Sequence, residues 1–219
     1  MTARARPIST PLRRITTAWS AVAVTYASDS GRTVTGLVLN SPWFDLQGAA
    51  HLRSIGTAAI RLVGRVKPAS LVKLPPGDAY GTSLASSHHG EWEFDTAWKP
   101  LTGFPVTFGW LRAIRIGHAR LHRGLDIGVP ALVLRSTRTH FTSTYSDAVD
   151  SADAVLDVRQ IARWSGCLGD DTRVVPIEGA RHDVFLSREA PRRRAYEVVD
   201  AWLRHETAML PRRTGAVAE

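Results

Sequence analysis

The chain has 219 residues, of which 44% are hydrophobic and 22% charged, a composition typical of one soluble globular domain. No apolar run reaches the roughly 20 residues of a membrane-spanning helix, so we expect no stable membrane insertion. The net charge of +8 comes from scattered arginines without a clustered basic face, which argues against a nucleic-acid or membrane-surface binding module. The single cysteine, Cys167, fits a cytoplasmic location.

Residues 1–34 differ in composition from the rest of the chain. They are rich in Arg, Thr, Ser and Ala and contain no acidic residue before Asp29. The basic start followed by AWSAVAV is similar to a secretory signal, but the apolar stretch is short and is interrupted by Ser20. We therefore predict a disordered or out-of-frame segment over 1–34, a domain over 35–207 and a flexible tail over 208–219.

The pattern sharpens from residue 35. The run TGLVLN (35–40) predicts a buried parallel strand. Residues 46–66 follow with helical periodicity, and Leu62 and Val66 belong to their apolar face. Residues 74–105 form a long irregular stretch rich in Pro, Gly, Ser and Trp, and loops of this length are usually functional lids or disordered segments. The aromatic residues in it favour a lid.

The second half of the sequence alternates helices and strands. Tyr196 and Trp202 belong to the apolar face of the last helix. This alternation predicts an α/β fold with a parallel sheet. The expected elements are a helix over 109–125, a strand over 129–136, a helix over 155–166, a strand over 172–179 and a helix over 190–206.

Two side chains at strand ends could support acid–base chemistry. Asp153 lies on the loop after strand 129–136, and His182, in EGARHDVFLS, lies on the loop after strand 172–179. The carboxyl ends of parallel strands meet at one edge of the sheet, where ligands bind. An imidazole that acts as a general base needs a carboxylate to fix its tautomer, so the sequence predicts an Asp–His pair. Asp150 and Asp157 are alternatives for the acid.

Several phrases resemble the later part of a lid-bearing α/β-hydrolase: GLVLNSPWFDLQG, EWEFDTAWKP, GHARLHRGLDI, DAVLDVRQI and GARHDVFLS. The branch resembled is that of bacterial lysophospholipase or monoacylglycerol-lipase-like proteins, often grouped with serine aminopeptidases, and the resemblance covers residues 35 to about 205. It implies the C-terminal part of an α/β-hydrolase fold, a parallel sheet flanked by helices, with a helical cap over about 46–105. It also implies Asp153 as triad acid, His182 as triad histidine, a small-molecule ester substrate and no cofactor. Asp153 is favoured because DAVLD resembles the family's Asp-x-hydrophobic-hydrophobic-Asp, whose first Asp orients the histidine.

The nucleophile of this family is not recognisable. Such hydrolases carry G-x-S-x-G on a strand-to-helix turn upstream of the strand matched by 35–40, and residues 1–34 contain no such motif. Cys167, in SGCLG, is one glycine short of the motif and follows a predicted helix, so we expect it to pack as a small hydrophobic residue. Ser41 follows a strand without flanking glycines, and we expect it to cap the next turn.

The remaining histidines do not predict a metal site. His118 and His122 share a predicted helix face, and His88-His89 precede Glu91 in the lid. Neither group has a third ligand at a matching spacing, so we expect no metal ion.

Two functional hypotheses remain. The first is a serine ester hydrolase for acylglycerol or lysophospholipid-type substrates, with a misplaced or frameshifted start. The second is a catalytically inactive binding or regulatory fragment. In the second case strand 35–40 would be an exposed edge, which residues 20–28 or a partner chain would cover.

Overall fold

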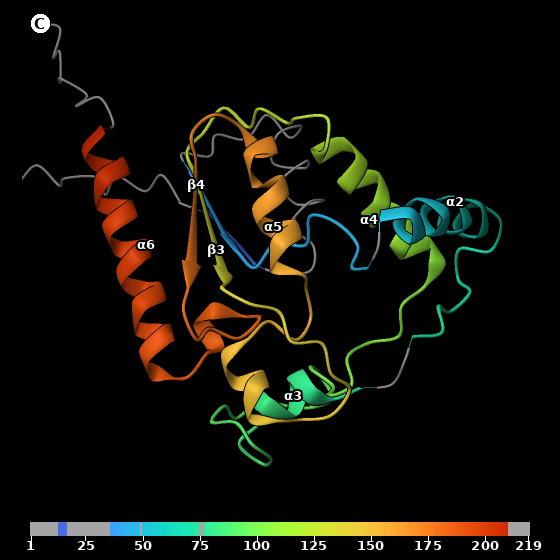
Figure 1. Ribbon diagram of the computed structural model, residues 1–219, viewed down its shortest axis with the longest axis horizontal. Coiled ribbons are helices and arrows are strands. Elements are labelled where there is room, and N and C mark those ends of the chain that lie inside the picture. Colours follow the sequence, from blue (N-terminus) through green and yellow to red (C-terminus); the bar gives the residue numbers. More distant parts are fainter. Residues whose placement is uncertain (1–12, 17–35, 49, 75–76, 210–219) are drawn as a thin grey trace, which may run out of the picture.

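The computed structural model describes residues 13–16, 36–48, 50–74 and 77–209. Their centre is a parallel sheet in the order β1-β2-β3-β4 (Figure 1). In its register, Leu37 lies opposite Ala131, and Ala131 lies opposite Thr172. The strands are β1 (Arg13–Thr16), β2 (Leu37–Asn40), β3 (Ala131–Ser136) and β4 (Thr172–Ile177).

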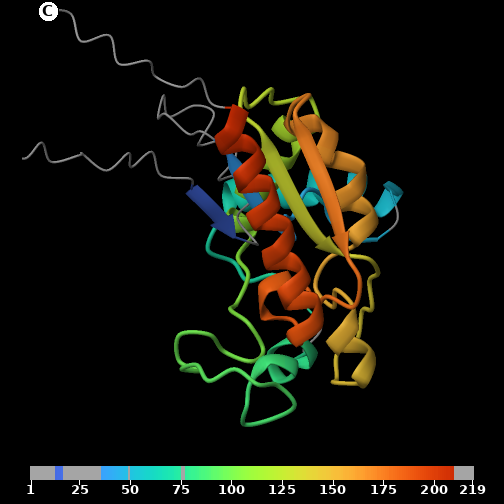
Figure 2. The same ribbon diagram turned by 90° about the vertical axis from the view of Figure 1, so that its left-hand side faces the viewer.

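Both faces of the sheet are covered, which explains why β2 and β3 are almost continuously apolar. Alternate residues of these strands enter two separate cores, because side chains of a strand point to opposite faces in turn. Helices α5 and α6 lie on opposite faces of the sheet (Figures 1 and 2). The α5 side includes Leu37, Leu39, Val133 and Ile161, and the α6 side includes Val38, Leu132, Leu134, Val198 and Trp202.

Three helices separate β2 from β3: α2 (Ala50–Val66), α3 (Ala79–Leu84) and α4 (Phe108–Leu121). Helix α2 packs closely on α4, since a Cβ atom on Gly64 would lie 2.5 Å from the carbonyl oxygen of Phe108. The predicted apolar face of α2 is wrong at Leu62 and Val66, which are 67% and 68% exposed. The face that meets α4 instead carries Gly64 and the buried Ile60.

The second half of the chain follows the predicted order of elements. Here α6 buries Ala195, Val198 and Trp202. Tyr196 was expected on that face, but it is 52% exposed and contacts the edge of the core through the ring of Phe185, 5.1 Å between centroids. The helical elements are η2 (Asp147–Ser151), α5 (Val158–Trp164), η3 (Ser165–Leu168), η4 (Val184–Leu186) and α6 (Glu189–Met209).

Strand β2 is not an edge strand, because β1 pairs with it along its whole length. The sequence suggested residues 20–28 or a partner chain as the cover, whereas Arg13–Thr16 provides it. Within the segment 1–34, for which disorder or an out-of-frame origin stays a prediction, the structure describes the strand Arg13–Thr16. The other residues of this segment, like most of the predicted tail over 208–219, lie outside the described residues. Of the helices in the described ranges, none has the length and apolarity to cross a bilayer.

Candidate active site

The predicted acid and histidine lie at the same edge of the sheet. Strand β3 ends at Ser136, and the loop after it carries Asp153. Strand β4 ends at Ile177, and the loop after it turns at Gly179, where φ is +68°, before it reaches His182. Glycine adopts this left-handed conformation without strain. Both side chains are buried, and only 5% of His182 is exposed.

His182 and Asp153 form a hydrogen-bonded pair. The Nδ1 atom of His182 lies 3.0 Å from Oδ2 of Asp153. The other oxygen, Oδ1, accepts hydrogen bonds from the backbone N–H groups of Val155, at 2.8 Å, and Leu156, at 2.7 Å. These two bonds fix the carboxylate and leave Oδ2 to the imidazole. A carboxylate partner assigns the proton to Nδ1 and leaves the Nε2 lone pair free to accept a proton.

The two rival aspartates have other partners. Asp157 accepts from the backbone N–H of Arg159 at 3.0 Å and is the N-cap of α5. Asp150 accepts from Nε of Arg181 at 3.1 Å and from Nη2 of Arg188 at 2.7 Å. The structure therefore brings Asp153 to His182 and directs both rivals elsewhere. The catalytic roles of Asp153 and His182 stay predictions.

Asn40, the last residue of β2, holds the residues after His182 in place. Its Nδ2 atom donates to Oδ1 of Asp183 at 2.5 Å, and its Oδ1 accepts from the backbone N–H of Val184 at 3.0 Å. Asp183 also accepts from the backbone N–H of Phe185 at 3.0 Å, which caps η4. Asn40 was not among the predicted site residues. The signal for it was a polar residue that ends a buried apolar strand.

An aromatic side chain from the segment between β2 and β3 lies against the histidine. The ring of Tyr80, from α3, meets the ring of His182 edge-on at 5.4 Å between centroids. Burial, followed by the charges of Asp183 and Asp153, raises the pKa of Tyr80 well above its usual value. Tyr80 is thus a neutral phenol at physiological pH. On its ring lies the ammonium group of Lys99, 5.5 Å from the centroid.

A cavity of about 590 Å³ opens beside the acid. Its wall includes Ala154 and Val155, which follow Asp153 directly, and Leu74 and Phe141 from the cap and the β3 loop. Gln47 crosses from the segment after β2 and donates to the carbonyl of Val155 at 2.7 Å. Most of this lining is apolar, so the cavity suits a hydrocarbon group.

In the described part of the chain, Nε2 of His182 has no hydrogen-bond partner. Ser41 directly follows β2 with φ at +43°, and its buried hydroxyl has no partner there either, so the predicted turn cap is wrong. Cys167 lies in η3, ahead of the amino end of β4, and packs against the core on the α5 side. A six-residue strand spans roughly 17–20 Å, so Cys167 and His182 lie toward opposite ends of β4.

His118, in α4, and His122, its C-cap residue, are hydrogen-bonded to protein atoms. His118 Nε2 lies 3.0 Å from the carbonyl of Trp43, and its Nδ1 lies 2.9 Å from Nη1 of Arg115. His122 Nε2 lies 2.8 Å from the carbonyl of Phe44. Across the four described ranges, no three His, Cys, Asp or Glu side chains converge as a metal site would require.

No protein-family model and no curated protein matches the chain. Among solved structures it is similar to a monoacylglycerol lipase of Paleococcus ferrophilus, with a TM-score of 0.59 and 16% identity over 85% of this chain and 65% of that one. It is also similar to a soluble variant of a monoglyceride lipase from Saccharomyces cerevisiae, solved with a substrate analog. There the TM-score is 0.56, with 13% identity over 85% of this chain and 62% of that one. The chain thus spans less than two thirds of either neighbour, and at these identities the likeness concerns the fold.

Proposed function

From the premise that the chain carries the C-terminal part of an α/β-hydrolase fold, we propose that it serves ester hydrolysis, with His182 as general base and Asp153 as the carboxylate that orients it. The observation that carries this proposal is the 3.0 Å contact between Nδ1 and Oδ2 at the carboxyl edge of the sheet. The neighbouring lipases add support at the level of the fold.

In the proposed reaction, Nε2 of His182 removes the proton from a nucleophilic hydroxyl group. The oxygen of that hydroxyl attacks the ester carbonyl at the same time. The negative charge of Asp153 stabilises the imidazolium that forms. The imidazolium then gives its proton to the departing alkoxide, and an acyl ester remains on the hydroxyl. Water, deprotonated in turn by Nε2, releases the carboxylic acid and restores the hydroxyl. In this second step the imidazolium returns the proton taken from water to the oxygen that carried the acyl group.

The substrate class that we propose is a small acylglycerol or lysophospholipid-type ester. The cavity beside Asp153 would take the acyl chain, because Leu74, Phe141 and Val155 give it an apolar wall. Tyr80, a neutral ring against His182, would keep water from the reacting carbonyl. The two similar structures described above are named as a monoacylglycerol lipase and a monoglyceride lipase.

A second candidate is a catalytically inactive fragment that binds esters without cleaving them. The observation in its favour is that the described residues provide no hydroxyl or thiol hydrogen-bonded to Nε2 of His182. The dyad, cap and cavity would then be retained for binding or regulation.

Fluorophosphonate labelling followed by intact-mass measurement separates the two candidates. The hydrolase proposal expects one covalent adduct on the unmodified chain, absent in His182→Gln and retained in His205→Gln, an exposed histidine of α6. Peptide mapping would then identify the nucleophile, with Ser41→Ala as a further variant. A chain that unfolds cooperatively by circular dichroism yet forms no adduct would contradict hydrolysis and support the inactive fragment.

A further inference from the structure

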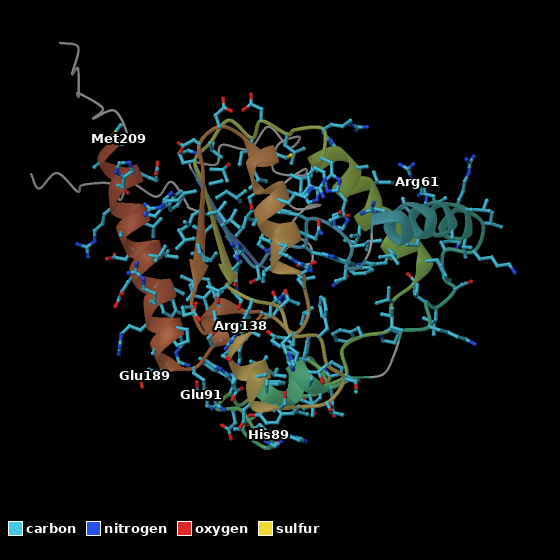
Figure 3. The ribbon with its side chains drawn as sticks, viewed as in Figure 1. Arg61, His89, Glu91, Arg138, Glu189 and Met209 are labelled. Atoms are coloured by element: carbon cyan, nitrogen blue, oxygen red, sulfur yellow. The ribbon has the colours of Figure 1, made fainter. Side chains whose placement is uncertain are left out.

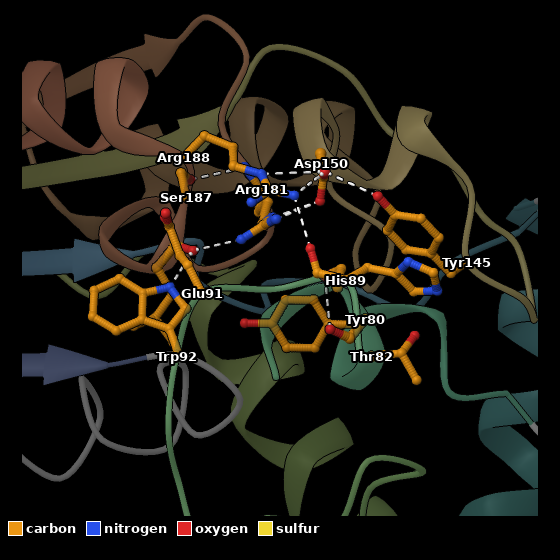
Figure 4. Close-up of polar contacts among 12 residues, drawn as sticks. Tyr80, Thr82, His89, Glu91, Trp92, Tyr145, Asp150, Arg181, Ser187 and Arg188 are labelled. Atoms are coloured by element: carbon orange, nitrogen blue, oxygen red, sulfur yellow. Dashed lines mark hydrogen bonds and ion pairs between the residues drawn. The ribbon is translucent and has the colours of Figure 1, made fainter. Parts of the chain in front are cut away.

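A second polar pair joins the two loops that carry the dyad. Asp150 lies three residues before Asp153, and Arg181 lies directly before His182. The guanidinium of Arg181 donates to Oδ1 of Asp150 through both Nη2 and Nε, the latter at 3.1 Å (Figure 4). The same side chain donates to the carbonyl of Leu186 at 3.1 Å. Arg181 therefore connects the loop of Asp153 to the residues that precede and follow His182 in the chain.

The positive charge of this pair, on Arg181, is out of contact with bulk water. Arg181 is fully buried, and a buried guanidinium is costly unless an anion faces it. Burial acts to raise the pKa of Asp150, but hydrogen bonds from Arg188 and Arg181 outweigh it and lower that pKa. Asp150 is thus a carboxylate at neutral pH, and it holds the loop of Arg181 at a fixed place.

The other oxygen of Asp150 connects to the cap segment, defined here as residues 88–92. Arg188 donates to Oδ2 of Asp150 from Nη2 at 2.7 Å, and the same Nη2 donates to the carbonyl of His89 at 2.8 Å. Tyr145 donates to Asp150 at 3.1 Å, and its ring stacks on the ring of His89 at 3.7 Å between centroids. His89 and Glu91 lie at the same end of the molecule as Glu189, where α6 begins (Figure 3).

We propose that Asp150 is a positioning residue: through Arg181 it sets His182 against Asp153, and through Arg188 it ties the cap segment to the same loops. The proposal rests on the proposed function in that His182 is the base. Asp150 is not part of the Nδ1–Oδ2 contact and acts through the two arginines, with Tyr145 as a further link to His89. Because a single carboxylate joins the two dyad loops and the cap, its loss affects the dyad and the cap together.

The test compares Asp150→Asn with Asp147→Asn, a change of the same kind at an exposed position of η2. One measurement is the low-field proton NMR signal of Nδ1–H in His182, identified by its loss in His182→Gln. The other is hydrogen exchange of the cap-segment amides, such as Trp92 N–H, which is bonded to the carbonyl of Leu84. In Asp150→Asn we expect the signal to broaden or vanish and exchange to quicken by about tenfold or more, since charge-assisted bonds are lost. Asp147→Asn should change neither.

A merely stabilising role for Asp150 would lower the melting temperature and leave the NMR signal in place, and that result would overturn the proposal. A signal and an exchange rate equal to those of Asp147→Asn would also overturn it. Should Asp150→Asn fail to fold, Arg188→Gln decides: it should quicken cap exchange, and unchanged exchange contradicts the link. Absence of the low-field signal from the unmodified chain, or its survival in Asp153→Asn, would instead count against the dyad of the proposed function.

Discussion

Two buried histidines show how their partners decide what an imidazole can do. His182 faces the carboxylate of Asp153 with Nδ1, and its Nε2 has no partner in the part of the chain that the structure describes. His118 has both nitrogens engaged, Nδ1 with Arg115 and Nε2 with the carbonyl of Trp43. The first arrangement leaves a lone pair for a substrate proton. The second leaves none.

The charges around His118 reinforce this difference. The pKa of His118 is lowered to about 4, chiefly by burial and next by the neighbouring charge of Arg115. The bond to Trp43 and the charge of Asp45 oppose the shift without reversing it. His118 is thus neutral at physiological pH and serves to join α4 to the turn after β2. Burial alone therefore does not distinguish the two histidines, whereas their hydrogen-bond partners do.

The largest effect that we expect follows the substitution Asp153→Asn. It replaces the acceptor of the Nδ1 proton by an amide, which neither stabilises the imidazolium nor fixes the same tautomer. The rate of fluorophosphonate labelling should fall roughly 10³–10⁴-fold. Mass spectrometry over a time course measures this rate.

His118→Gln is the control for this prediction. It removes the buried imidazole whose two nitrogens are both hydrogen-bonded. At a temperature where the variant is folded, its labelling rate should therefore stay close to that of the unmodified protein. A loss as large as that of Asp153→Asn would show that the two histidines act together.

A smaller effect concerns the pH dependence of stability. The folded-state pKa of His118 is about 4 and its ordinary value is 6.5, so between these values the unfolded chain binds a proton that the folded chain does not. The stability that the neutral imidazole provides is therefore complete above pH 6.5 and is lost as the pH falls to 4, by up to about 3 kcal/mol. Urea unfolding at several pH values measures it.

His118→Gln should be less stable at pH 7 and should show a shallower decline over the same pH window. The comparison matters because His122, whose pKa burial also lowers, lies in the same cluster and titrates as well. Burial acts to raise the pKa of Asp45, but the hydrogen bond and charge of Arg115 hold that pKa below the ordinary value, so Asp45 stays charged over this window. An equally steep decline in the variant would assign the pH dependence to His122 instead.

The strands of this fold could be predicted because β2 and β3 are apolar runs that must be buried on both faces. The packing contacts of the helices between β2 and β3 could not be predicted in this way. Helix α2 packs on α4 through Gly64, while Leu62 and Val66, which belong to its predicted apolar face, are exposed. Strand β1, with the sequence RRIT, has no strand-like apolar pattern and depends on its partner β2.

For the site, chain order was sufficient to locate the pair at one edge of the sheet, since parallel strands end together. Resemblance favoured Asp153 among three aspartates within eight positions, and the structure separates them by their partners. The roles of Asp150 and Asn40 could not be predicted. They depend on residues more than 30 and 140 positions away, which only the folded chain brings together.

The smallest effect comes from the third aspartate and would sharpen the assignment of the acid. Asp157→Ala removes the side chain that accepts from the backbone N–H of Arg159 at the start of α5, and loss of such a cap costs about 1 kcal/mol. Urea unfolding should show this decrease, while the low-field signal of His182 and the labelling rate stay unchanged. A lost signal would mean that Asp157 supports the dyad through the Asp153 loop. Stability and signal both unchanged would mean that Asp157 supports neither α5 nor the dyad.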